Sequence, residues 1–205
     1  GRFPSVEVFE LPFMMQSPEA TSKALWDYVE QYAGAEFKDV KPLAFHVHGD
    51  GVFHMTNKPV RTAADLKGLK LRAPTRQTNK FLAMLGATPV SMPVPQVGDA
   101  LSKGVIDGAV VPYEVVPAVK IQELVRFHSE TDPAEPAFYT STFIFAMNKA
   151  KYDSLPADLK KVIDANSGQA LSGQVGKAFL QADMEGKKLT ARNTTNVIPA
   201  TELAQ

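Results

Sequence analysis

The sequence contains no cysteine. This absence excludes disulfide bonds, zinc sites with thiolate ligands and thiol catalysis in one step. It suits an exported protein that avoids stray disulfides, and it fits a cytosolic protein nearly as well. No apolar run approaches the roughly 18 residues of a membrane-spanning helix. Because the chain begins with Gly1 rather than Met and shows no signal peptide, we expect a processed or trimmed product from which any signal has been removed.

The chain also lacks an excess of either charge. Its 205 residues include 22 lysines and arginines and 22 aspartates and glutamates, so the formal net charge is zero. A balanced total gives no reason to expect a nucleic-acid partner, although it does not exclude a local basic patch. With 44% hydrophobic residues, the chain can bury the core of one domain or of two small ones.

No internal repeat or low-complexity tract is present; short strand patterns alternate instead with short helix patterns. Strands are expected at 6–15, on both sides of the turn signal 49–51 within 40–57, and at 69–72, 87–93, 105–111, 137–148 and 195–199. Helices are expected at 18–34, 63–68, 76–86, 94–104, 113–125 and, as the longest, 157–188, with a polar segment at 129–136. The helix within 113–125 is either kinked at Pro117 or starts there. Ser17, Thr62 and Thr75 stand at the expected N-caps. This alternation predicts βαβ units and an α/β fold.

Three histidines form the best candidate metal site. His46 and His48 alternate along one expected strand, so they point to the same face, and His54 returns on the next strand. They would be the ligands of a zinc-dependent hydrolase. The plainer interpretation is that they are strand histidines beside a turn, because no fourth ligand or general base is evident.

Other catalytic motifs are scarce. The sequence has no GxSxG elbow and no Walker loop. Asp107 follows a buried strand and could be a catalytic acid, but an Asp-Gly pair is more often only a turn.

Arg72 is the strongest candidate for ligand binding. It ends the short strand in "DLKGLKLRAPT", and side chains at the carboxyl ends of parallel strands project into the crevice where α/β sheets bind ligands. A guanidinium there can hold a carboxylate through two parallel hydrogen bonds. The helix starting at Thr75 adds free N–H groups, and Asn79 lies one turn further on. The alternative is a surface arginine paired with Asp65 or Glu114.

Several segments together resemble one protein family. The stretches are "EVFELPFMMQSPEAT", "DLKGLKLRAPT", "LGATPVSMP", "VGDALSKGVIDGAVVP" and "LPADLKKVI", in this order along the chain. They are similar to the signature of the DctP-type substrate-binding proteins of tripartite ATP-independent periplasmic (TRAP) transporters.

The resemblance implies a two-lobed periplasmic binding protein of α/β class, each lobe a sheet flanked by helices, joined by long hinge strands and a helix. It would be a receptor without catalytic activity or cofactor that delivers an organic acid to the integral membrane subunits of the transporter. We expect residues 1–50 with 137–177 in lobe I, whose N-terminal part is missing here, and 51–136 with 178–205 in lobe II. In such proteins the arginine of this strand binds the ligand carboxylate, which implies that role for Arg72.

Departures from the family pattern bear on the ligand. Phe53 stands where sialic-acid-binding members have a second arginine, and Val111 where they have an asparagine. Ala109 and Val110 replace the pair with which other members hold a metal ion. A site lined by Phe53, Val94, Val111 and Tyr113 would leave the polar groups of a sugar unpaired. We therefore expect a monocarboxylate with an apolar body, aromatic or branched aliphatic, bound with help from Thr75 and Asn79.

Overall fold

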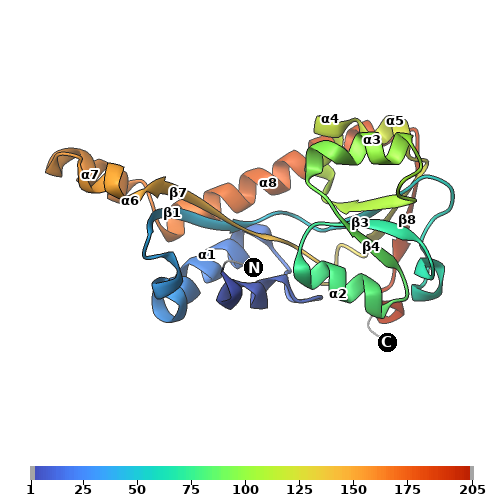
Figure 1. Ribbon diagram of the computed structural model, residues 1–205, viewed down its shortest axis with the longest axis horizontal. Coiled ribbons are helices and arrows are strands. Elements are labelled where there is room, and N and C mark those ends of the chain that lie inside the picture. Colours follow the sequence, from blue (N-terminus) through green and yellow to red (C-terminus); the bar gives the residue numbers. More distant parts are fainter. Residues whose placement is uncertain (1–2, 204–205) are drawn as a thin grey trace.

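The computed structural model describes residues 3–203, in which the strands form two separate sheets (Figure 1). The larger sheet has six strands in the order β4-β3-β5-β2-β6-β8, and the smaller one pairs β1 with β7. The strand bounds are β1 Val40–Val47, β2 Val52–Met55, β3 Lys70–Ala73, β4 Thr88–Ser91, β5 Gly108–Val111, β6 Phe127–Thr131, β7 Thr142–Asn148 and β8 Thr194–Ile198.

The six-stranded sheet is mixed. β3 runs parallel to both β4 and β5, β6 runs parallel to β8, and β2 runs antiparallel to its neighbours β5 and β6. The parallel part is built from the expected strand–helix alternation, with α2 (Arg76–Met84) and α3 (Val97–Ser102) as crossover helices. The predicted cap of α2 is confirmed, because the Thr75 side chain accepts a hydrogen bond from the backbone N–H of Thr78. The α/β prediction is therefore correct.

Alternate residues of the central strands enter two different cores. Phe53 and Val110 lie opposite one another and belong to the core under α2, whereas Val52 and Val111 form the next pair and belong to the core under α3. Arg72 lies opposite Ala109, which places it on the same face as Val111. This two-residue period determines which side chains can meet at a ligand site.

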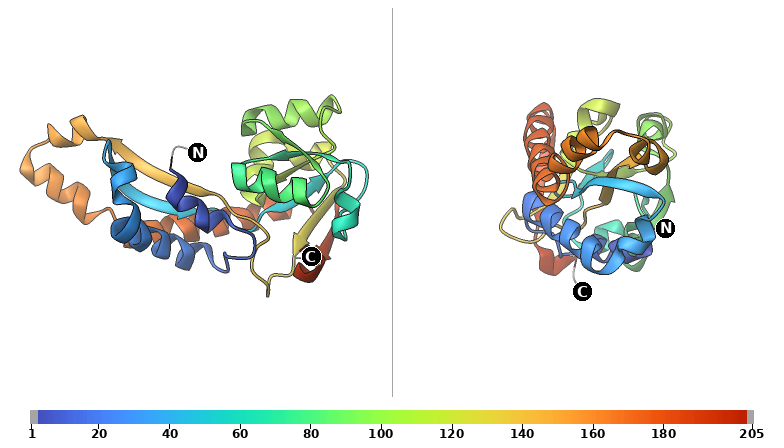
Figure 2. Two further views of the ribbon diagram at one scale, coloured as in Figure 1. Left: turned by 60° about the horizontal axis from the view of Figure 1, so that its bottom comes forward. Right: turned by 90° about the vertical axis from the view of Figure 1, so that its left-hand side faces the viewer.

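The smaller sheet forms an arm that extends from the larger one (Figure 1). One face of the β1–β7 pair packs on α1 (Pro18–Tyr28), and α8 (Gln169–Leu189) contacts both α1 and β1. α8 continues past the arm and also contacts η6 (Tyr113–Val115) and α4 (Val116–Val119) beside the larger sheet (Figure 2). Three connections thus run between the two sheets: α8, the segment after β1 and the segment before β7.

Several element predictions need correction. β1 and β2 are real strands but do not form a hairpin, because residues 49–51 carry the chain from one sheet to the other. Residues 6–10 lie in a 3₁₀ helix, η1 (Pro4–Glu10), rather than in a strand. The predicted long helix is broken into α7 (Ala157–Ala165) and α8, because Gly168 adopts φ +99, a conformation that interrupts a helix.

Two further expectations differ in extent. The expected helix 113–125 consists of η6, α4 and α5 (Ile121–Leu124), separated at Lys120, whose φ is +53. β6 (Phe127–Thr131) overlaps the polar segment 129–136, for which no strand was predicted. The remaining elements are η2 Val29–Ala33, η3 Gly34–Phe37, η4 Ala63–Leu66, η5 Val94–Gln96, α6 Lys149–Asp153 and η7 Ala200–Glu202.

Within residues 3–203, no helix combines the length and the apolar character that crossing a membrane would require.

The close packing of α8 on α1 generates a stability prediction. A Cβ at Gly176 would lie 2.4 Å from the Pro18 carbonyl oxygen and 2.6 Å from Ser22 Oγ, so Gly176→Ala should force the helices apart. We expect the free energy of unfolding to fall by about 1–3 kcal/mol in urea denaturation.

Gly173→Ala, one turn earlier on α8, is the matched control. Its Cβ would meet only the flexible end of Lys23, so this variant should retain or slightly exceed the stability of the original protein. Equal losses in the two variants would contradict this account of the helix packing.

Candidate functional site

A cavity of about 480 Å³ lies where the larger sheet meets the arm. Its walls come from segments far apart in the sequence: the end of β3, the segment after β5, the start of β7 and the middle of α8. The residues that line it are His48, Arg72, Pro74, Thr75, Val94, Val111, Pro112, Glu114, Val115, Ala118, Tyr139, Ser141, Thr142, Phe143 and Phe179.

Arg72 is the buried cation of this cavity. Arg72 is only 5% exposed. Its guanidinium group donates one hydrogen bond from Nε to the Met92 carbonyl (3.1 Å) and another from Nη1 to the Val110 carbonyl (3.2 Å). These two bonds fix the plane of the guanidinium and leave three of its five N–H groups for another partner. No ion pair joins Arg72 to an acidic side chain within residues 3–203.

The alternative pairings for this arginine are therefore not observed. Asp65 instead accepts hydrogen bonds from the backbone N–H groups of Arg61 and Thr62 as part of the capping box that the sequence predicts. Burial lowers the pKa of Arg72, which shows that the site disfavours the isolated charge. An anion in the cavity would offset this cost of desolvation.

Aromatic side chains also line the cavity. Phe143 of β7 and Phe179 of α8 lie with their ring centroids 6.2 Å apart, and Tyr139 contacts the His48 ring edge to face. Ser141 also lines the cavity and is buried. The sequence did not single out these residues, because nothing local shows that β7 and α8 lie against the end of β3.

Four of the predicted site residues line this cavity: Arg72, Thr75, Val94 and Val111. The other three lie elsewhere. Phe53 is fully buried in the core under α2, stacked on Phe138, because β2 presents alternate residues to opposite faces. Asn79 donates to the Thr75 carbonyl and accepts from Ser91, so it braces α2.

Tyr113 lines a different cavity, on the other side of the segment that follows β5. Its neighbours in the chain, Pro112 and Glu114, do line the cavity of Arg72.

The histidines do not form the metal site considered above. His46, on the smaller sheet, packs against the rings of Phe143 and Phe179. His54, on the larger sheet, is hydrogen-bonded to His128 and to the Val111 carbonyl. Within the described part of the chain, no three His, Cys, Asp or Glu side chains are grouped so that they could hold a metal ion. The zinc-hydrolase interpretation thus has no support from the structure.

His48 joins the two strands that connect the sheets. Its Nε2 accepts from the backbone N–H of Ser141 (3.1 Å), which leaves Nδ1 to donate to the Gly49 carbonyl (2.5 Å). This arrangement requires the neutral ring. Burial lowers the pKa of His48 to about 4, with His46 and Arg72 as further positive neighbours.

Comparison with protein families gives one match over almost the whole chain. Residues 1–204 match the family described as bacterial extracellular solute-binding protein, family 7 (DctP). Among curated proteins, the chain is 30% identical over 173 residues to the 2,3-diketo-L-gulonate-binding periplasmic protein YiaO of Escherichia coli, covering 83% of this chain and 51% of that protein.

Solved structures are more similar. A TRAP solute-binding protein from Rhodoferax ferrireducens T118, in complex with copurified benzoate, is 57% identical with a TM-score of 0.96. A marine metagenome TRAP solute-binding protein, described as specific for aromatic acid ligands and bound to metahydroxyphenylacetate, is 48% identical with a TM-score of 0.95. The matches cover 99% and 100% of this chain but 64% of each of those chains, so this chain spans about two thirds of their length.

The neutral His48 ring predicts a specific pH dependence of stability. A histidine whose folded-state pKa lies below its ordinary 6.5 stabilises the fold fully above about pH 6.5, and its contribution is lost as pH falls toward about 4. His48→Gln removes this titration while retaining an acceptor. We expect the stability advantage of the original protein over the variant to shrink by about 1–3 kcal/mol between about pH 7.5 and pH 4.5.

Urea denaturation of both proteins at the two pH values measures this difference. Comparing the two proteins cancels the titration of His54, Asp50 and Asp183, which are common to both. An advantage that stays constant with pH would show that His48 is not held neutral by the fold.

Proposed function

Since the chain belongs to the bacterial extracellular solute-binding proteins of family 7, we propose that it is an extracytoplasmic receptor that binds an aromatic monocarboxylate at Arg72. One observation carries the proposal: a buried guanidinium that has no acidic partner within residues 3–203 lines a cavity whose other lining residues are largely apolar. A carboxylate is the partner for which the planar fork of N–H groups is best suited.

The apolar walls favour a ring as the body of the ligand. Val94, Val111, Val115 and Ala118 line the cavity together with Phe143 and Phe179. Burying roughly 100 Å² of ring surface between such walls would contribute about 2–3 kcal/mol to binding. Benzoate and metahydroxyphenylacetate, the ligands of the two solved relatives above, combine a ring with a single carboxylate and support this choice.

Glu114 favours a single carboxylate. Its half-buried side chain lines the same cavity, makes no ion pair with Arg72, and has its pKa raised by burial. A second carboxylate on the ligand would meet this acid without a second cation to balance it.

The two sheets suggest how binding would be transmitted. We propose that residues 1–50 with 137–177 form one lobe and 51–136 with 178–205 the other, and that the cavity between them closes on the ligand. The crossing segments at His48 and Ser141, together with α8, would act as the hinge. In this proposal the closed receptor delivers its ligand, without catalysis, to the membrane subunits of a TRAP transporter from the periplasm.

Isothermal titration calorimetry with benzoate, isophthalate, succinate and sialic acid tests the proposed ligand class. We expect benzoate to bind at least about tenfold more tightly than the other three, a difference of about 1.4 kcal/mol or more. Arg72→Ala should abolish benzoate binding. Arg72→Lys should weaken it by about 100-fold, because a point charge cannot reproduce two parallel hydrogen bonds.

Arg76→Lys is the matched control, since Arg76 is an exposed arginine of α2 that pairs with Glu7 outside the cavity. Circular dichroism checks that each variant folds. Unchanged benzoate affinity in Arg72→Lys, or tighter binding of succinate than of benzoate, would overturn the proposal.

A further inference from the structure

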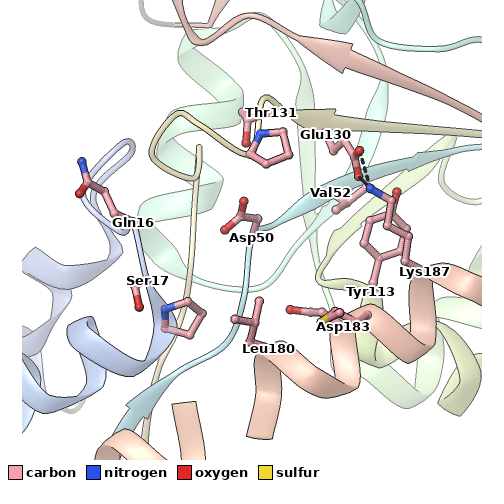
Figure 3. Close-up of a pocket in the computed structure, with 13 residues that line it drawn as sticks. Gln16, Ser17, Asp50, Val52, Tyr113, Glu130, Thr131, Leu180, Asp183 and Lys187 are labelled. Atoms are coloured by element: carbon pink, nitrogen blue, oxygen red, sulfur yellow. Dashed lines mark hydrogen bonds and ion pairs between the residues drawn. The ribbon is translucent and has the colours of Figure 1, made fainter. Parts of the chain in front are cut away.

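A second cavity, of about 350 Å³, is drawn in Figure 3 and shares no lining residue with the cavity that contains Arg72. It is formed by the loop before α1, the start of β2, the end of β6 and the second half of α8. The residues that line it are Gln16, Ser17, Pro18, Asp50, Val52, Tyr113, Glu130, Thr131, Pro133, Leu180, Asp183, Met184 and Lys187.

The charges in this cavity are not balanced. Lys187 pairs with both carboxylate oxygens of Glu130, at 2.7 and 2.8 Å. Asp50 and Asp183 extend from the crossing segment and from α8 into the same region, and neither forms an ion pair with a basic side chain of residues 3–203 (Figure 3). The cavity therefore holds two acids beyond its one ion pair.

Buried polar atoms without partners gather around the same cavity. Asp183 accepts the backbone N–H of Glu114 through Oδ1 (2.8 Å), but its Oδ2 has no hydrogen-bond partner among residues 3–203, although Asp183 is only 8% exposed. Thr131 Oγ1 is also unpartnered, in a residue 2% exposed. Buried oxygens of this kind are rarely left unsatisfied, so a partner from outside the chain is expected at both.

The chemistry of that partner follows from the walls. The unpartnered oxygens and the Asp50 carboxylate can all accept hydrogen bonds, whereas Val52, Leu180 and Met184 are apolar. No group of three acidic or histidine side chains suited to a metal ion occurs within residues 3–203. We propose that this cavity is a second binding site, which takes a small protonated amine whose ammonium group lies between Asp50 and Asp183.

The pKa values of the two acids agree with this assignment. Burial raises the pKa of Asp50 to about 6 and that of Asp183 to about 7, and the neighbouring acids Glu130 and Glu114 add to the increase. Lys187 opposes the shift at Asp50 only partly. A bound cation would stabilise both ionised carboxylates, so amine binding should strengthen as pH rises through this range.

This site does not rest on the acid-binding function proposed above. The two cavities lie on opposite sides of the segment 111–115, and no lining residue is shared between them. Either could be occupied while the other is empty.

Calorimetric titration with ethylammonium chloride at about pH 8, in buffer of matched ionic strength, tests the site. Two control titrations accompany it. Sodium chloride tests whether a metal cation binds in place of the amine, and ethanol tests whether a neutral molecule of similar shape binds. We expect saturable binding of ethylammonium alone, at least about tenfold weaker at pH 5 than at pH 8, because Asp50 is then mostly protonated.

Asp50→Asn should weaken ethylammonium binding by at least about tenfold, since the amide keeps the shape and removes the charge. No hydrogen bond joins Asp50 to another side chain or backbone group of residues 3–203, so the substitution should leave the fold intact. The control is Glu123→Gln, at an exposed acid of α5, which should bind ethylammonium like the original protein. The proposal is overturned by the absence of binding at pH 8, by equal binding of sodium, or by an Asp50→Asn variant that binds like the original protein.

Discussion

The arrangement of the molecule around its cavity depends on one buried charge, the guanidinium of Arg72. Two backbone carbonyls, those of Met92 and Val110, hold it in place, yet neither neutralises it. A buried cation without a counter-ion is costly, and proteins retain such groups where an anionic ligand supplies the missing charge. The apolar residues on the same face of the sheet then determine which anions fit.

The connections between the two sheets give this charge its setting. His48 and Ser141 join the two crossing segments through a hydrogen bond that requires a neutral ring, and α8 packs against both the arm and the segment after β5. Residues of the cavity wall come from all three connections. Any relative movement of the two sheets would therefore change the shape of the cavity, which is how a receptor could couple ligand binding to closure.

Local signals in the sequence correctly predicted where several helices begin. The caps at Ser17, Thr62 and Thr75 depend only on neighbouring residues, and all three are observed at the starts of their helices. β6 was missed because its sequence is polar, and only the folded structure supplies partners for its buried side chains: Ser129 is hydrogen-bonded to Val60 and Asn196. Phe53 was expected at the site because it stands where related receptors have a second arginine. The register of β2 against β5, which is not encoded locally, places it in the core under α2 instead.

The cavity itself was predictable only in part. Arg72 and Thr75 follow from the strand–helix pattern and Val94 and Val111 from the family resemblance, whereas Phe143 and Phe179 reach the cavity through contacts between distant segments. The most direct measurement of the central claim is a crystal structure of the protein with benzoate. The account predicts both carboxylate oxygens within about 3.2 Å of the Arg72 guanidinium nitrogens. Benzoate bound away from Arg72, or with its ring rather than its carboxylate against the guanidinium, would contradict it.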